Sequence, residues 1–241
     1  MKRKNLLPFT TVLFSSVTLG LSSLTYAASY QWDANSTVSP DPAGGTGVWD
    51  ANASANWWDG TANVVWPALG GTDDDAVFGA TAGTVSLATG GITVNDITFN
   101  TTGYLIQSNT LTLNGTSSVI TTAPAVTATI SSALAGTANI NKTGSGVLIL
   151  SGANSAFTGK TSISEGALSI ASDAALGAAP VVAVADQLTL NGGELRITVA
   201  GQTLHANRGI TLGSSGGTID TSTIATSGAT TTIAGVIAGT G

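Results

Sequence analysis

Residues 142–170 decide the fold of this chain, and they read Lys-Thr-Gly-Ser-Gly-Val-Leu-Ile-Leu-Ser-Gly-Ala-Asn-Ser-Ala-Phe-Thr-Gly-Lys-Thr-Ser-Ile-Ser-Glu-Gly-Ala-Leu-Ser-Ile. Short β-forming runs alternate with turns of small residues, which predicts strands at 147–150, 160–164 and 167–170. Phe157 is the one large side chain between them. A unit this small cannot bury both of its faces alone, so we expect it to stack on copies of itself.

The same stretch resembles the autotransporter-associated β-strand repeat, which occurs in the passenger regions of bacterial type V secreted proteins. The resemblance is carried by an ordered set of glycine, aliphatic and polar positions: Lys142, Gly144, Gly146, Leu148, Leu150, Gly152, Asn154, Phe157, Gly159, Gly166 and Leu168. It implies a right-handed parallel β-helix, with no catalytic residues to carry over and no cofactor. It also implies that the full-length protein has an outer-membrane β-barrel, through which the passenger is exported.

Aliphatic residues recur on both sides of this motif at a nearly constant spacing. The series is Ile92, Leu111, Ile130, Leu148, Leu168, Leu188, Ile210 and Ile233, with steps of 18 to 23 residues. A period near 20 predicts one coil of a β-helix per repeat, and therefore about eight coils over residues 84–241. Inward aliphatic side chains would form ladders, while Thr and Ser would alternate with them and face outward. An antiparallel sandwich also has short alternating strands, but it need not keep one period.

The composition favours the same all-β class and excludes several kinds of site. Of the 241 residues, 42% are hydrophobic, only 8% are charged and 31 are glycine, which fits short strands and turns better than disorder. The absence of cysteine excludes disulfides and thiolate metal sites. A net charge of −6 argues against nucleic acid or an anionic membrane as a partner.

Residues 1–27 have the pattern of a secretory signal peptide. Lys2-Arg3-Lys4 supplies the positive start, residues 11–24 are apolar, and Thr25-Tyr26-Ala27 predicts cleavage after Ala27. A membrane anchor is the alternative, but the apolar run is shorter than the ~20 residues of a spanning helix. We therefore expect an exported chain with no transmembrane span after cleavage, located at the bacterial cell surface or secreted, or periplasmic if truncated.

Residues 28–83 differ from the rest because they hold all the tryptophans: Trp32, Trp49, Trp57, Trp58 and Trp66. One interpretation is a cap, in which the rings close the open end of the first coil. The other is a glycan-binding surface, in which exposed rings stack on sugar faces. The run Asp73-Asp74-Asp75 suggests a calcium site, but it lacks the spaced pattern of calcium loops and reads better as a solvated turn.

Catalytic chemistry has few candidates in the repeat region. His205 is the only histidine and lies in a turn-rich segment, so we interpret it as a surface residue. Glu194 and Arg196 alternate and could share one outward face, as in a polysaccharide lyase or hydrolase, but an ion pair also explains them and is the commoner arrangement. We expect no enzyme activity.

The end of the chain repeats an earlier segment. Residues 231–241 are similar to residues 128–138, which lead into the opening motif. Another repeat would be expected next, so we interpret the chain as the N-terminal part of a longer passenger, truncated in its repeat region.

The hypothesis that follows is a non-catalytic structural segment of an autotransporter passenger, a stalk-like or adhesin-like β-helix. Its partner would be an extracellular glycan or a host surface. The alternatives are a carbohydrate-binding module that uses the tryptophans and a β-helix polysaccharide lyase or hydrolase.

Overall fold

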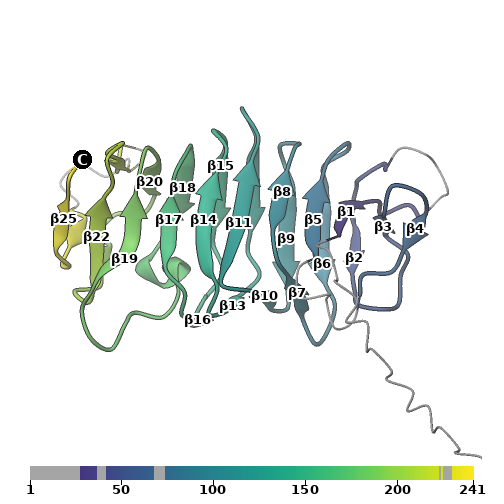
Figure 1. The fold of residues 1–241 in the computed structure, drawn as a ribbon, viewed down its shortest axis with the longest axis horizontal. Helices are drawn as coiled ribbons and strands as arrows, with labels where there is room; N and C mark the ends of the chain where they lie inside the picture. The colour runs from purple at the N-terminus through teal and green to yellow at the C-terminus, as the bar shows by residue number, and fades with distance from the viewer. Residues whose placement is uncertain (1–27, 37–41, 68–73, 223, 225–229) are drawn as a thin grey trace, which may run out of the picture.

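The structure is a computed structural model that describes residues 28–36, 42–67, 74–222, 224 and 230–241. The predicted signal peptide and its cleavage site after Ala27 lie outside these residues. The described chain winds into a long rod of stacked parallel strands, with the N-terminal strands at one end and the C-terminal ones at the other (Figure 1). This confirms the predicted all-β fold and its parallel β-helix architecture.

One side of the rod is an eleven-stranded sheet within the described residues, called the long sheet below. In spatial order it contains β25 (Ile237–Gly239), β22 (Arg208–Leu212), β19 (Val184–Leu190), β17 (Thr161–Ile163), β14 (Asn139–Thr143), β11 (Ser117–Thr122), β8 (Ile97–Phe99), β5 (Asp75–Phe78), β1 (Ser29–Trp32), β3 (Trp57–Trp58) and β4 (Asn63–Val64). All neighbours pair in parallel except at the N-terminal end, where β1, β3 and β4 are antiparallel. That change of direction separates the first coil from the regular stack.

The second side is an eight-stranded sheet, called the second sheet. It contains β2 (Gly47–Trp49), β6 (Thr84–Leu87), β9 (Leu105–Ser108), β12 (Thr127–Ile130), β15 (Val147–Leu150), β18 (Ala167–Ile170), β20 (Glu194–Ile197) and β23 (Thr218–Asp220). Val147–Leu150 and Ala167–Ile170 are two of the three strands that the opening motif predicts, and they pair directly in this sheet.

The third side is discontinuous. Its first part is a short sheet of β7 (Ile92–Val94), β10 (Leu111–Leu113), β13 (Leu134–Gly136) and β16 (Ala156–Phe157). A 3-10 helix, η1 (Asp173–Leu176), follows in the next coil, and β21 (Thr203–Leu204) and β24 (Thr232–Ile233) then pair with each other. No helix in the described part of the chain is long and apolar enough to cross a membrane.

The coils are somewhat longer than the period of about 20 that the sequence suggested. Positions in register along the long sheet are Ala76, Ile97, Ile120, Lys142, Ile163, Leu190, Leu212 and Gly239, which gives about seven turns of 21 to 27 residues. The evenly spaced aliphatic residues of the sequence do not all lie on one side of the rod. Ile92 lies on the short sheet, Leu148 on the second sheet and Leu188 on the long sheet, because the spacing between them is shorter than a full coil.

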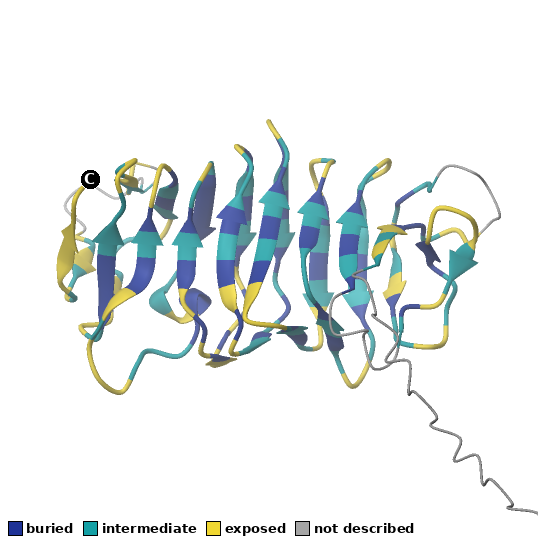
Figure 2. Ribbon diagram, viewed as in Figure 1, coloured by how far each residue is buried: buried dark blue, intermediate teal, exposed yellow. Residues whose placement is uncertain are grey.

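The core is a set of apolar ladders inside the rod. Along many strands, buried and partly exposed residues alternate, which appears as banding in Figure 2. In one ladder of the second sheet, Ala128, Leu148, Leu168 and Leu195 stack in successive coils, and each is fully buried. Each such leucine contributes about 1.5–3 kcal/mol of burial free energy. The repeat therefore stabilises the rod one coil at a time.

Candidate functional site

All five tryptophans lie inside the first coils. Exposed fractions are 1% or less for four of them and 8% for Trp58. The rings of Trp49, Trp57 and Trp66 contact one another with centroids 4.7 to 4.9 Å apart. Phe78 joins them, 5.6 Å from Trp57, and stacks in turn on Phe99 at 5.2 Å. The aromatic side chains thus form one continuous cluster from the N-terminal end into the regular stack.

This burial removes the basis of the glycan-binding hypothesis for these residues. A sugar stacks on an exposed ring face, and even Trp58 keeps little exposed surface. Trp32 and Trp66 donate their indole N–H groups to the carbonyls of Gly45 and Thr93, at 2.8 and 3.1 Å. Their hydrogen bonds and ring contacts are made within the protein, as the cap interpretation requires.

The aspartates that follow three of the tryptophans organise the turns of this region. Asp50 accepts hydrogen bonds from the backbone and hydroxyl of Ser54, both at 2.7 Å. Asp59 accepts from the backbone N–H groups of Thr61 and Ala62, and these bonds, that of Ala62 first, lower the pKa of its carboxyl. The Trp-Asp pairs therefore combine an inward ring with a turn-forming carboxylate, a role that the sequence analysis did not identify.

The acidic run offers no assembled calcium site in the described residues. Asp75 accepts hydrogen bonds from the Asn95 side chain and the Asp96 backbone N–H, at 2.9 and 3.1 Å. Asp74 is buried, and Asp73 lies outside the described residues. Across that part of the chain, no three His, Asp or Glu side chains gather where they could hold a metal ion.

The motif glycines are needed for space as much as for backbone conformation. Gly144 has φ of +70°, and a Cβ placed on it would overlap the Thr122 carbonyl of the coil below. Gly152 has no positive φ, yet a Cβ there would overlap the Ser132 carbonyl in the same way. Close approach between successive coils is the more general reason for them.

Lys142 is completely buried inside the rod. It occupies an inward ladder position of the long sheet, between Ile120 and Ile163. Its ammonium group donates to the carbonyls of Thr143, Gly144 and Glu165 at 2.8, 2.7 and 3.2 Å. Burial lowers the pKa of Lys142 to about 8, and the nearby Glu165 charge opposes that shift. The motif lysine therefore ties the corner of its own coil to that of the next.

Asn154 and Phe157 complete the interior of the motif. The Asn154 side chain accepts a hydrogen bond from the backbone of Leu134 at 2.8 Å and donates one to the carbonyl of Ala175 at 2.6 Å. These partners lie in the preceding and following coils, so one buried amide joins three coils. Phe157 is 1% exposed and lies on β16, a short strand that the sequence analysis did not predict.

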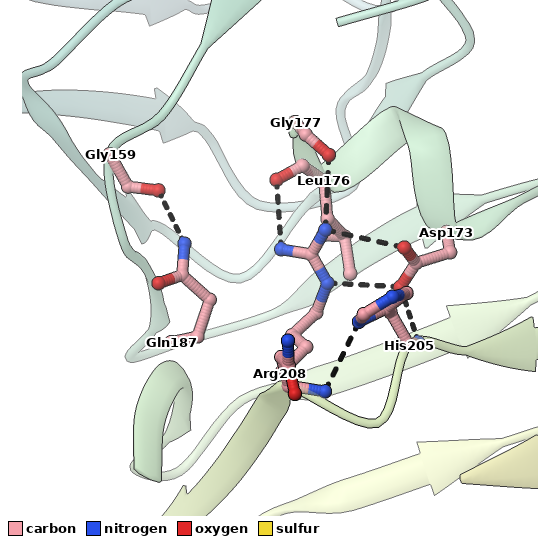
Figure 3. Close-up of polar contacts among 8 residues, drawn as sticks. Gly159, Asp173, Leu176, Gly177, Gln187, His205 and Arg208 are labelled. Atoms are coloured by element: carbon pink, nitrogen blue, oxygen red, sulfur yellow. Dashed lines mark hydrogen bonds and ion pairs between the residues drawn. The ribbon is translucent and has the colours of Figure 1, made fainter. Parts of the chain in front are cut away.

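Arg208 is the second buried cation and holds η1 in place (Figure 3). Its guanidinium is 1% exposed and pairs with the Asp173 carboxylate at 2.9 Å. It also donates to the carbonyls of Leu176 and Gly177 at 3.2 and 3.0 Å. His205 lies beside it, exposed, and its ring accepts a hydrogen bond from the backbone of Asn207. The network supplies hydrogen-bond donors to the carbonyls at the C-terminal end of the 3-10 helix, at the point where the short sheet is interrupted.

Two ion-pair groups lie on the outside of the rod. Arg196 contacts Glu194 at 2.7 Å and Asp220 at 3.2 Å, which confirms the expected ion pair on one outward face. Lys160 contacts Asp186 at 2.7 Å on the long sheet. The carboxylates of the first group are both engaged by Arg196, so the arrangement does not present the separated acid and base of a glycosidase.

Comparison with known proteins agrees with this architecture. Residues 140–170 match the model of the passenger-associated-transport-repeat family. The chain is 42% identical over 173 residues to the adhesin BmaC autotransporter of Brucella suis biovar 1 (strain 1330), an alignment that covers 70% of this chain. The chain spans about 5% of the length of that curated relative. No solved structure matches it.

Proposed function

The chain is an autotransporter passenger repeat protein, and from this premise we propose that it forms a rigid, non-catalytic segment of a bacterial surface adhesin. One observation carries the proposal. The long sheet runs without a break from β1 to β25, and the passenger repeat at residues 140–170 contributes β14 and β17 to it and β15 and β18 to the second sheet. Every motif position described above serves the stacking of that coil on its neighbours.

Such a rod suits export and display. Each coil buries its aliphatic residues against the coil before it, so the chain can gain stability progressively as it emerges from a membrane. The signal peptide predicted at residues 1–27 would begin this export, and the β-barrel of the full-length protein would complete it. The adhesin-like role is supported by the relative, which is named as an adhesin.

A display experiment tests this proposal. The chain is placed ahead of the β-barrel of an unrelated autotransporter in a bacterial host, and intact cells are labelled with an antibody against an epitope in the chain. We expect surface labelling, a protease-resistant core and increased attachment of the cells to glycan-coated or host-cell surfaces. The matched control is Leu148→Asp, which places a carboxylate in the core ladder and should abolish protease resistance.

Retention of the wild-type chain inside the cell would contradict the proposed export. Surface display without any gain in attachment would contradict the adhesin role but leave the structural role intact. Hydrolysis or cleavage of a polysaccharide by the purified protein would contradict the non-catalytic assignment.

A further inference from the structure

The outer face of the long sheet is hollowed into a shallow polar groove of about 240 Å³. It crosses four consecutive strands, β11, β14, β17 and β19, at the middle of the rod. Its main lining residues are Asn139, Asn141, Lys160, Ser162, Asp186 and Thr189. They are amide, hydroxyl and ionic side chains, and none is aromatic.

A local departure from regular pairing directs one of these residues outward. The register between β19 and β22 shifts between Val184 and Leu188. As a result Gln187 and Leu188 are both buried in succession, and the Gln187 side chain donates to the Gly159 carbonyl at 2.9 Å. Asp186 is left on the outer face with 52% of its side chain exposed. Irregularities of this kind are enriched where a strand directs a side chain to a binding site.

The groove can donate and accept hydrogen bonds in alternation. Asn139 uses its oxygen to accept from the Lys160 backbone at 3.0 Å, and Asn141 uses its own to accept from Ser164 at 2.8 Å. Their NH₂ groups remain as donors toward a ligand. The hydroxyls of Ser162 and Thr189 can act both as donors and as acceptors. A ligand with many hydroxyl groups matches this pattern.

The charges in the groove favour an uncharged ligand. Lys160 and Asp186 form a 2.7 Å ion pair and neutralise each other, so the groove has no net charge of its own. The chain as a whole has a net charge of −6, which repels polyanions such as acidic polysaccharides and nucleic acids. Successive strands are about 4.8 Å apart, so the groove offers a row of polar groups that an extended glycan can follow along the rod.

We propose that this groove binds an uncharged, extended glycan chain through hydrogen bonds to its hydroxyl groups. Asn141, Ser162 and Thr189 contact the chain along the rod, and the Lys160–Asp186 pair bridges adjacent hydroxyls at one side. The inference gives a ligand class to the proposed adhesin and rests on that function for its biological setting. Without an aromatic platform the affinity of one site is weak, with Kd on the order of 1 mM, and display of many copies raises the avidity.

The test uses the purified protein in solution, so its result does not depend on export or display. Cellohexaose, mannohexaose and laminarihexaose are titrated into ¹⁵N-labelled protein, with a heparin hexasaccharide as the polyanionic comparison. We expect at least one neutral hexaose to shift the amide resonances of Asn141, Ser162 and Thr189, and the heparin fragment to leave them unchanged.

Variants separate the groove from other surfaces. Ser162→Trp fills the groove from an outward position and should weaken binding at least tenfold while the circular dichroism spectrum is retained. The double variant Lys160→Met/Asp186→Leu should weaken binding about tenfold, as expected for lost hydrogen bonds to charged groups. Arg196→Gln is the matched control, since it disrupts an ion pair on the second sheet and should leave the affinity unchanged.

Three results would overturn the proposal. The first is that none of the neutral hexaoses, at about 20 times the expected Kd of ~1 mM, shifts a resonance in the groove. The others are binding that survives Ser162→Trp, and binding of the heparin fragment alone. In each case the display experiment above would remain informative, because it reports on export and attachment without reference to this groove.

Discussion

Replacement of Lys142 by methionine tests whether a buried ammonium group weakens the rod at neutral pH. The side chain is fully buried, and burial lowers its pKa from 10.5 to about 8. The pKa in the folded state is then below that in the unfolded chain, so between pH 8 and 10.5 the unfolded chain binds more protons. The free energy of unfolding must therefore rise with pH across this window, by about 1.4 kcal/mol per pH unit at most.

The expected magnitude follows from these two values. Between pH 7 and pH 10 the wild-type protein should gain about 2.5 kcal/mol relative to Lys142→Met. The comparison is made as a difference because other groups titrate in the same range. Burial raises the pKa of Tyr104 to about 12, so ionisation of that tyrosine in the unfolded chain lowers stability above pH 10 in both proteins.

The assay is urea unfolding followed by circular dichroism at half-unit steps from pH 7 to pH 10. Leu148→Ala is the control, since it destabilises the core without changing a titratable group, and its curve should run parallel to that of the wild type. A difference between wild type and Lys142→Met that stays constant with pH would refute the reasoning. It would mean that the carbonyls of Thr143, Gly144 and Glu165 solvate the ammonium as well as water does.

Three further predictions concern packing and stacking. Gly144→Ala should destabilise the protein by more than 2 kcal/mol in urea unfolding because its Cβ would overlap Thr122, whereas Gly216→Ala, at a similar φ of +66° with no atom within 4 Å, should cost about 1 kcal/mol. Arg208→Met should cost about 1.5–3 kcal/mol, because it leaves the partly buried Asp173 carboxylate without its cation, and hydrogen exchange should accelerate at residues 172–178. Trp57→Ala should cost about 3–5 kcal/mol, and the wild-type fluorescence should be blue-shifted and protected from iodide.

The apolar strands and their stacking could be predicted from the sequence. Val147–Leu150 is a short aliphatic run between turns, and Ala167–Ile170 alternates small and aliphatic residues. Both patterns predict a strand with buried side chains, and both strands were located correctly. The repeat also predicted that copies would stack. The length of each coil was less accessible, because aliphatic residues occur on three sides and an equal spacing can pass from one side to the next.

The positions of the key polar side chains could not be predicted in the same way. Lys142 was identified only as a motif position, since a lysine between strands is ordinarily solvated, and its burial depends on which carbonyls the next coil brings to it. The burial of Arg208 depends on its contacts with η1, which lies where other coils have a strand, in a coil of 27 residues. No local sequence pattern predicts that helix. Asp186 faces outward because of a register shift, and register is a property of two paired strands.

The two buried cations influence which coils can pair with each other. A rod built only of equivalent aliphatic ladders would bury nearly the same surface if one coil paired with the wrong neighbour. Lys142 completes its hydrogen bonds only when the Glu165 carbonyl lies in the adjoining coil. Arg208 is satisfied only when Asp173 and the carbonyls of Leu176 and Gly177 lie in the coil before it. A slipped pairing would leave a charge in an apolar ladder, at a cost of several kcal/mol. These residues therefore lower the stability that the core could reach, and in return they favour one order of stacking among coils that otherwise resemble one another.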